Sequence, residues 1–214
     1  MKNFRFLAIF LVVALCATFL VSCEKDDDIG GNEGSVSKIV ATNVNIPVET
    51  ATIKAHSGSY YDSDVIAQTP YNKNNGFTLE LPASLSANYL RPISSIIVNE
   101  DIIQFFSISD KTVRWCWLGD IVAYDSDDRR ICDLEYIGEN DYIFCDGLWL
   151  YVNKDVVIKG THEDHWGYVT TIDLNLKKGW NTCYRWEDDY SAKTDFFTSK
   201  KPSGLNFAWE SWYN

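Results

Sequence analysis

The chain has 214 residues, with 30 acidic and 19 basic side chains and a formal net charge of −11 at pH 7. This acidic excess argues against nucleic acid, or an anionic membrane surface, as a partner bound through a basic patch. Aromatic residues reach 14%, the single Met is the first residue, and Val, Ile and Thr are frequent, so the composition favours strands over helices.

The chain begins with a targeting pattern. Lys2 and Arg5 give a positive start, residues 6–21 follow without a charge, and Ser22 precedes Cys23. The uncharged run suits a signal sequence and falls short of the roughly 20 residues that span a bilayer. This order resembles the lipobox of bacterial lipoproteins, which implies a signal peptide over 1–22 and a lipid-carrying Cys23 that holds the protein on a membrane. The alternatives are a secretory signal cleaved elsewhere, with Cys23 unmodified, and an uncleaved single-span anchor.

Residues 23–35 predict a flexible tether, because the segment after Cys23 is polar and rich in acidic residues and glycine. It leads to a folded domain over 36–214. Within the tether, Lys25-Asp26-Asp27-Asp28 is similar to the export signal of surface-exposed lipoproteins in Bacteroidetes. That resemblance implies an outer-membrane lipoprotein exposed at the cell surface. A solvated acidic spacer is the alternative interpretation of the same run.

Four strands are predicted in the first part of the domain, at 36–47, 50–56, 65–69 and 77–81. A turn over 72–76 separates the last two, because Asn-Gly readily supplies a positive φ. The last strand alternates strictly, so that its Phe and Leu side chains share one face. Residues 49–82 resemble the first half of the transthyretin-like or carboxypeptidase-regulatory-like modules of Bacteroidetes lipoproteins. The resemblance implies an antiparallel Greek-key β-sandwich without catalytic activity.

Residues 83–110 are less regular and mark the place where the domain could be subdivided. Here 96–98 fits a strand, or a loop with a helical turn around 84–89. Two turns further on, at Gly119-Asp120 and Asp146-Gly147, are expected to interrupt strands. The remaining predicted strands are 113–118, 121–124, 131–136, 142–145, 148–152, 155–160, 168–176, 180–186, 194–199 and 205–209. Strands at this spacing indicate an all-β sandwich, with one pair of sheets or two packed pairs.

Four cysteines remain once Cys16 leaves with the signal peptide and Cys23 carries lipid: Cys116, Cys132, Cys145 and Cys183. In an exported protein they could form two disulfides, with the connectivity left open by the sequence. The alternative is four small, buried hydrophobic side chains. No C-x-x-C occurs, so the sequence supports neither a redox pair nor a zinc knuckle.

No cofactor site or catalytic residue is predicted. His162 and His165 lie on an expected loop at H-x-x-H spacing, which differs from the helical H-E-x-x-H of zinc enzymes, so we expect no tight zinc site. The segment 125–136 lacks the Gly and Glu of a calcium-binding EF-hand loop; a structural calcium in an acidic loop (62–64, 125–128 or 187–189) is the alternative. A small glycan hydrolase with two carboxylates distant in sequence is the alternative to a non-catalytic binding or structural role.

Trp166 and Trp186 are the candidate ligand contacts, because they flank acidic loops, whereas most of the 8 Trp residues are expected in the core. If the strands around them form a meander, loops 160–167 and 187–193 fall at one end of the sandwich. Trp166, Trp186, Glu163, Asp188 and Asp189 would then form an acidic, aromatic patch suited to a neutral glycan or a basic protein of the envelope. The competing interpretation turns both Trp side chains inward as loop anchors.

Overall fold

The computed structural model describes residues 35–58, 64–97, 100–140, 143–188 and 193–213. The predicted all-β class is confirmed, because these residues form mostly strands, with short 3₁₀ helices at Ala87–Tyr89, Ile93–Ile96 and Glu100–Phe105. The strands are β1 (Lys38–Ala41), β2 (Thr50–Ser57), β3 (Val65–Asn72), β4 (Phe77–Glu80), β5 (Arg91–Pro92), β6 (Phe106–Ile108), β7 (Arg114–Tyr124), β8 (Arg130–Glu139), β9 (Ile143–Val152), β10 (Val156–Glu163), β11 (Val169–Leu176), β12 (Gly179–Asp188), β13 (Thr194–Thr198) and β14 (Asn206–Trp212).

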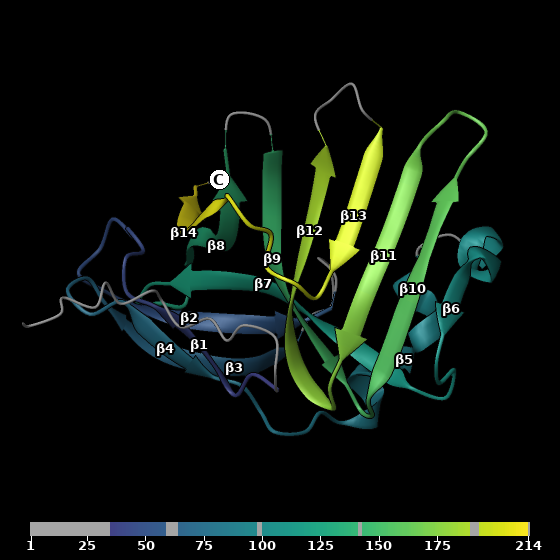
Figure 1. Ribbon diagram of the computed structural model, residues 1–214. Coiled ribbons are helices and arrows are strands. Elements are labelled where there is room, and N and C mark those ends of the chain that lie inside the picture. The colour runs from purple at the N-terminus through teal and green to yellow at the C-terminus, as the bar shows by residue number, and fades with distance from the viewer. Residues whose placement is uncertain (1–34, 59–63, 98–99, 141–142, 189–192, 214) are drawn as a thin grey trace, which may run out of the picture.

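The strands form two sheets (Figure 1). The small sheet consists of β1 and β4. The large sheet has twelve strands, with the order β3-β2-β7-β8-β9-β12-β13-β11-β10-β6, and with β14 beside β8 and β5 beside β7. Among the described strands every pairing is antiparallel except that of β11 with β13, which is parallel.

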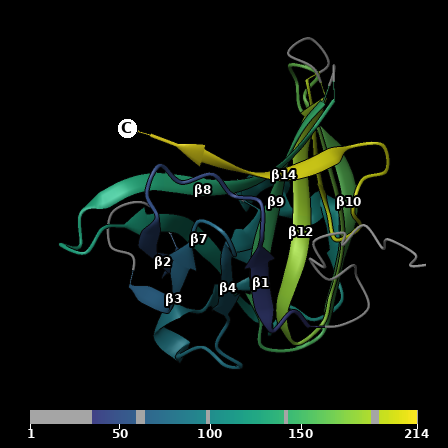
Figure 2. The same cartoon turned by 90° about the vertical axis from the view of Figure 1, so that its left-hand side faces the viewer.

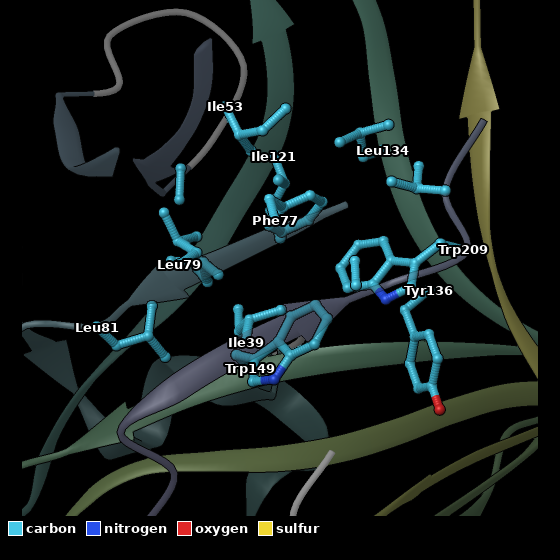
Figure 3. Close-up of a cluster of buried hydrophobic side chains, with 14 of the residues drawn as sticks. Ile39, Ile53, Phe77, Leu79, Leu81, Ile121, Leu134, Tyr136, Trp149 and Trp209 are labelled. Atoms are coloured by element: carbon cyan, nitrogen blue, oxygen red, sulfur yellow. The ribbon is translucent and has the colours of Figure 1, made fainter. Parts of the chain in front are cut away.

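The two sheets enclose the first hydrophobic core. Ile39 of β1 and Leu79 of β4 are fully buried and pack with Ile53 of β2 and Leu134 of β8 (Figure 3). The predicted alternation at 77–81 is confirmed, because Phe77, Leu79 and Leu81 are buried while Thr78 and Glu80 are exposed. The first strand is shorter than the predicted 36–47, because only Lys38–Ala41 pairs with β4.

The large sheet divides where β7, β8 and β9 meet. The first part of β7 pairs with β9 at Trp115–Trp117, whereas its last part pairs with β8 at Ile121–Tyr124. The far half of β8 pairs with β9. Figure 2 shows the result: β9, β12 and β10 stand nearly edge-on, and β8 and β14 lead away from them.

Two predicted interruptions are wrong, because β7 runs through Gly119-Asp120 and β9 runs through Asp146-Gly147. In both strands the glycine allows a close approach instead of a turn. A Cβ at Gly119 would lie 2.2 Å from the carbonyl oxygen of Gly58, and a Cβ at Gly147 would lie 2.4 Å from the ring of Tyr136.

The irregular segment covers one face of the second hydrophobic core. Ile93, Ile96 and Ile97 are buried against Leu150, Ile158 and other residues of β9 to β12. Of the two predicted alternatives, the helical turn around 84–89 is found as the 3₁₀ helix Ala87–Tyr89. The strand at 96–98 is not formed at Ile96 and Ile97, because Ile93–Ile96 is a 3₁₀ helix; Val98 lies outside the described residues. The described part of the chain contains no helix long and apolar enough to cross a membrane.

The four cysteines of the domain are free and buried, which answers the question that the sequence left open. Burial raises the pKa of Cys116 and Cys132 to about 11 and that of Cys145 to about 12, and it also raises the pKa of Cys183. The thiolate is the reactive form of cysteine, so these four side chains act as small apolar residues.

A substitution at Gly76 tests how closely β1 packs on the turn between β3 and β4. Gly76 has a φ of +67°, and a Cβ there would lie 1.7 Å from the carbonyl oxygen of Ala41. We expect Gly76→Ala to lower the free energy of unfolding by more than about 2 kcal/mol, because left-handed backbone costs Ala about 1–2 kcal/mol before β1 moves to relieve the clash. Urea denaturation measures the change.

Gly167→Ala is the matched control for that substitution. Gly167 has a φ of +78° but nothing within 4 Å of the added Cβ. The Gly167→Ala variant should therefore lose only the conformational part of the stability, about 1–2 kcal/mol. Equal losses for the two variants would show that contact with Ala41 is unimportant.

Candidate functional site

A straight row of side chains crosses four neighbouring strands on one face of the large sheet. Trp186 of β12 lies opposite Phe196 of β13, Phe196 lies opposite Thr171 of β11, and Thr171 lies opposite Thr161 of β10. Side chains directly opposite each other on paired strands share a face. We call Trp186, Phe196, Thr171 and Thr161 the cross-strand row.

One half of the cross-strand row is aromatic and the other half carries hydroxyl groups. The rings of Trp186 and Phe196 stack with their centroids 4.9 Å apart and their planes 16° apart. Both side chains are half-buried, and neither belongs to the two clusters of buried residues in the described chain. The hydroxyl oxygens of Thr161 and Thr171 are 3.2 Å apart. The row thus presents an apolar ring surface next to groups that can donate and accept hydrogen bonds.

The charges beside the cross-strand row are balanced. Asp173 lies two residues from Thr171 on the same face, and its carboxylate contacts the Nζ atoms of Lys159 at 2.8 Å and Lys200 at 3.6 Å. The hydrogen bond from Lys159 is the main cause that lowers the pKa of Asp173. Glu163, two residues beyond Thr161, is exposed on the same face. Among the described side chains here, two cations therefore face two carboxylates.

The tip of the β10–β11 hairpin presents two aromatic side chains to solvent. Trp166 is 59% exposed and Tyr168 is 53% exposed. The carboxylate of Asp164 shapes the turn by accepting hydrogen bonds from the backbone N–H groups of Trp166 at 2.8 Å and Tyr168 at 2.9 Å. These hydrogen bonds lower the pKa of Asp164, and the one from Tyr168 has the largest effect.

Lys193 ties this tip to the start of β13. Its Nζ donates a hydrogen bond of 2.7 Å to the carbonyl oxygen of Trp166 and lies 5.0 Å from the centre of the Tyr168 ring. Its own carbonyl oxygen accepts a 2.8 Å hydrogen bond from the N–H of Val169. Lys193 has a φ of +50°, which is uncommon outside glycine and places this residue in a constrained turn.

The strand ends that lead into the two predicted loops lie at one end of the sheet, although residues 189–192 of the second loop lie outside the described residues. The start of β11 at Val169 lies beside the start of β13 at Thr194, which in turn lies beside the end of β12 at Asp188. The predicted meander is wrong, because β13 lies between β11 and β12. The loop at 160–167 is also shorter than predicted, because β10 continues to Glu163.

The predicted patch is therefore distributed over a face and a tip. Trp186 lies on the sheet face, whereas Trp166 lies at the exposed hairpin tip with its ring 3.5 Å from that of His165. The inward-turned arrangement is absent for Trp166, which is exposed, whereas Trp186 is half-buried. The side chain of Asp188 and the whole of Asp189 lie outside the described residues.

The metal candidates have other partners. The ring of His162 stacks on Phe105 at 4.3 Å, whereas His165 contacts Trp166. Asp125 accepts hydrogen bonds from the backbone of Asp127 and Arg129 within its own hairpin. In the ranges that the structure describes, no group of three or more His, Cys, Asp or Glu is arranged to hold a metal ion.

A second acidic cluster was missed by the sequence analysis. Glu135 of β8 lies directly opposite Glu210 of β14, and Asp133 lies opposite the exposed Trp212. Burial is the first cause that raises the pKa of Glu135, followed by the nearby carboxylate of Asp146. Alternation places Asp133 and Glu135 on one face, but their partners on β14 lie more than 70 residues away in the chain, so no local pattern reveals the cluster.

We expect Glu135→Gln to raise the melting temperature at pH 7. A raised pKa in the folded state means that the ionised carboxylate opposes folding, so the neutral amide removes a penalty that is present above this pKa. Thermal melts at pH 7 and near pH 4 check this, because the gain should fade where the wild-type carboxyl group is protonated. Glu163→Gln should change neither melt, because Glu163 is exposed, like Glu135, but lies opposite Val169 and not opposite another carboxylate. A lower melting temperature for Glu135→Gln at pH 7 would contradict the interpretation.

No protein-family model, no curated protein and no solved structure matches this chain.

Proposed function

We propose that this protein is a lipid-anchored lipoprotein of the outer cell surface whose domain binds a neutral glycan without catalysing a reaction. The cross-strand row carries the proposal. It combines stacked aromatic rings, hydroxyl groups and balanced charges on an open face of the sheet. Each ring of the stacked pair covers one face of the other, so the apolar ring surface that remains uncovered would contact the C–H groups of a sugar. The hydroxyl and carboxylate oxygens suit sugar hydroxyls.

The hairpin tip supports the same role. Trp166 and Tyr168 are large aromatic side chains held outside the core by a turn that Asp164 and Lys193 fix in place. Rigid, exposed aromatic side chains supply contact area to a ligand at a low cost in conformational entropy. The tip lies at the same end of the sheet as the final residues of β12, which also carries Trp186.

The anchor is supported by the sequence of the first 28 residues and by the place where the chain reaches the sheet. The N–H of Val36 donates a 2.7 Å hydrogen bond to the carbonyl oxygen of Trp180, near the start of β12. The hairpin tip at Trp166 lies beyond the opposite end of these strands, because β12 ends beside the start of β13. A lipid on Cys23 would thus leave the tip free to contact a ligand.

Replacement of Trp186 by Ala tests the glycan site. We expect glycan binding to weaken by about tenfold or more, that is by about 1.4 kcal/mol or more, while the melting temperature changes little. A neutral glycan array followed by calorimetry measures affinity, and a thermal melt measures stability. Trp212→Ala is the control, because it removes an indole that is 49% exposed at the other acidic cluster.

Two outcomes would contradict the proposed function. A melting temperature many degrees lower for Trp186→Ala would make Trp186 a structural residue, and the site would be abandoned. Release of reducing ends from a glycan, abolished by Glu135→Gln, would instead favour the hydrolase alternative. In that case Glu135, whose raised pKa suits a general acid, would act with a second carboxylate of its cluster.

Metabolic labelling with palmitate tests the anchor. We expect labelling of the wild-type chain and none for Cys23→Ala, because Cys23 would carry the acyl chains. Cys16→Ala is the matched control, since Cys16 lies within the uncharged run and would be removed with the signal peptide. Equal labelling of Cys23→Ala and wild type would contradict lipidation at this site.

A further inference from the structure

The direction of the cross-strand row limits the length and the orientation of a ligand that could bind along it. Its members follow one another across β12, β13, β11 and β10, so the row runs perpendicular to the strands. Neighbouring strands are about 4.8 Å apart, so the row is about 14 Å long. A sugar residue in an extended chain is about as long as one strand spacing. The row therefore matches about four consecutive sugar residues.

We infer that the face binds a linear, uncharged polysaccharide that lies across the strands, with one end on Trp186 and Phe196 and the other on Thr171 and Thr161. This inference rests on the proposed glycan-binding function and adds the shape, the charge and the orientation of the ligand. The stacked rings form the apolar half of the path. The paired threonine hydroxyls form the polar half and retain hydrogen-bonding capacity beyond their mutual contact.

The charge balance of the face argues for an uncharged chain. Lys159 and Lys200 both contact the carboxylate of Asp173, and Glu163 offsets the remaining positive charge. A polyanion would have to compete with Asp173 for the two lysines, and a polycation would have to displace them. A neutral chain needs neither change, and its hydroxyl groups can hydrogen-bond to the ion pairs as they stand.

The flatness of the face argues for a chain instead of a single sugar. The four members of the row lie on adjacent strands of one sheet, so each touches a ligand from one side only. A single sugar on such a surface would bury little of its area and bind weakly. Several linked sugars share the entropic cost of binding, so the affinity should grow with chain length until the row is filled.

Calorimetry on the full-length protein, in a detergent without a sugar headgroup, tests the inference. The probes are linear β-glucan and β-mannan oligosaccharides, from monosaccharide to hexasaccharide. We expect the affinity to rise with each added sugar up to about the tetrasaccharide and then to level off. Trp186→Ala should weaken binding of every length, because the aromatic end serves even the disaccharide.

Thr161→Val gives the sharpest result, because it removes one hydroxyl at the far end of the row with little change in volume. It should lower the affinity for the tetrasaccharide several-fold and leave that for the disaccharide unchanged. Thr170→Val is the matched control, since Thr170 belongs to the same strand as Thr171 but faces the opposite side of the sheet. Its affinities should equal those of the wild type at every length.

The possible failures separate the inference from the proposed function. A monosaccharide that binds as tightly as the tetrasaccharide, or a disaccharide affinity reduced by Thr161→Val, would leave a glycan site but overturn the path across the strands. A uronic-acid oligosaccharide that binds more tightly than its neutral counterpart would overturn the requirement for an uncharged chain. Absence of binding for every probe and for a neutral glycan array would overturn both proposals.

Discussion

The architecture of the large sheet depends on two glycines, Gly138 and Gly147, that lie in close contact with aromatic rings. The Tyr136 ring occupies the place where Gly147 would carry a Cβ, and the Phe207 ring does the same at Gly138. Tyr136 also contacts the rings of Trp149 and Trp209, which stack 5.7 Å apart. Only glycine lets the strands approach these rings so closely, and this approach allows β8 to pair with β14 on one edge and with β7 and β9 on the other.

The division of the sheet leaves β9 to β12 free to extend as a separate surface, and the parallel strand β13 completes it. This strand fills the upper part of the space between β11 and β12, but it ends at Thr198. Beyond the end of β13, the side chain of Asn181 stabilises the turn that joins β11 to β12. It hydrogen-bonds the backbone N–H and carbonyl oxygen of Lys177 and the carbonyl oxygen of Gly179. The cross-strand row exists because β13 brings Phe196 between Trp186 and Thr171.

Local patterns predicted the strands well, but they could not predict which strands would be neighbours. The alternation at 77–81 and the Asn-Gly turn depend on residues close in sequence, and both are found in the structure. Trp186 was identified as a candidate ligand contact from the acidic residues next to it in the sequence. Its partners Phe196, Thr171 and Thr161 were missed, because they meet only through the register of three pairings. The turns wrongly placed at Gly119 and Gly147 have the same origin, since a glycine that relieves a distant contact has the same local pattern as one in a turn.

The contact of Val36 with Trp180 has a mechanical consequence. If a lipid on Cys23 holds the chain, as proposed above, tension from a bound ligand would reach the folded domain at Val36, whose hydrogen bond to Trp180 is at the base of β12. Trp180 is itself held in the core by a 2.9 Å hydrogen bond from its indole nitrogen to Pro82. The same strand carries Trp186, and β12 pairs with β9 from Gly179 to Asp188. A pull along β12 would load that whole ladder in shear, so its hydrogen bonds would have to break together and not one after another.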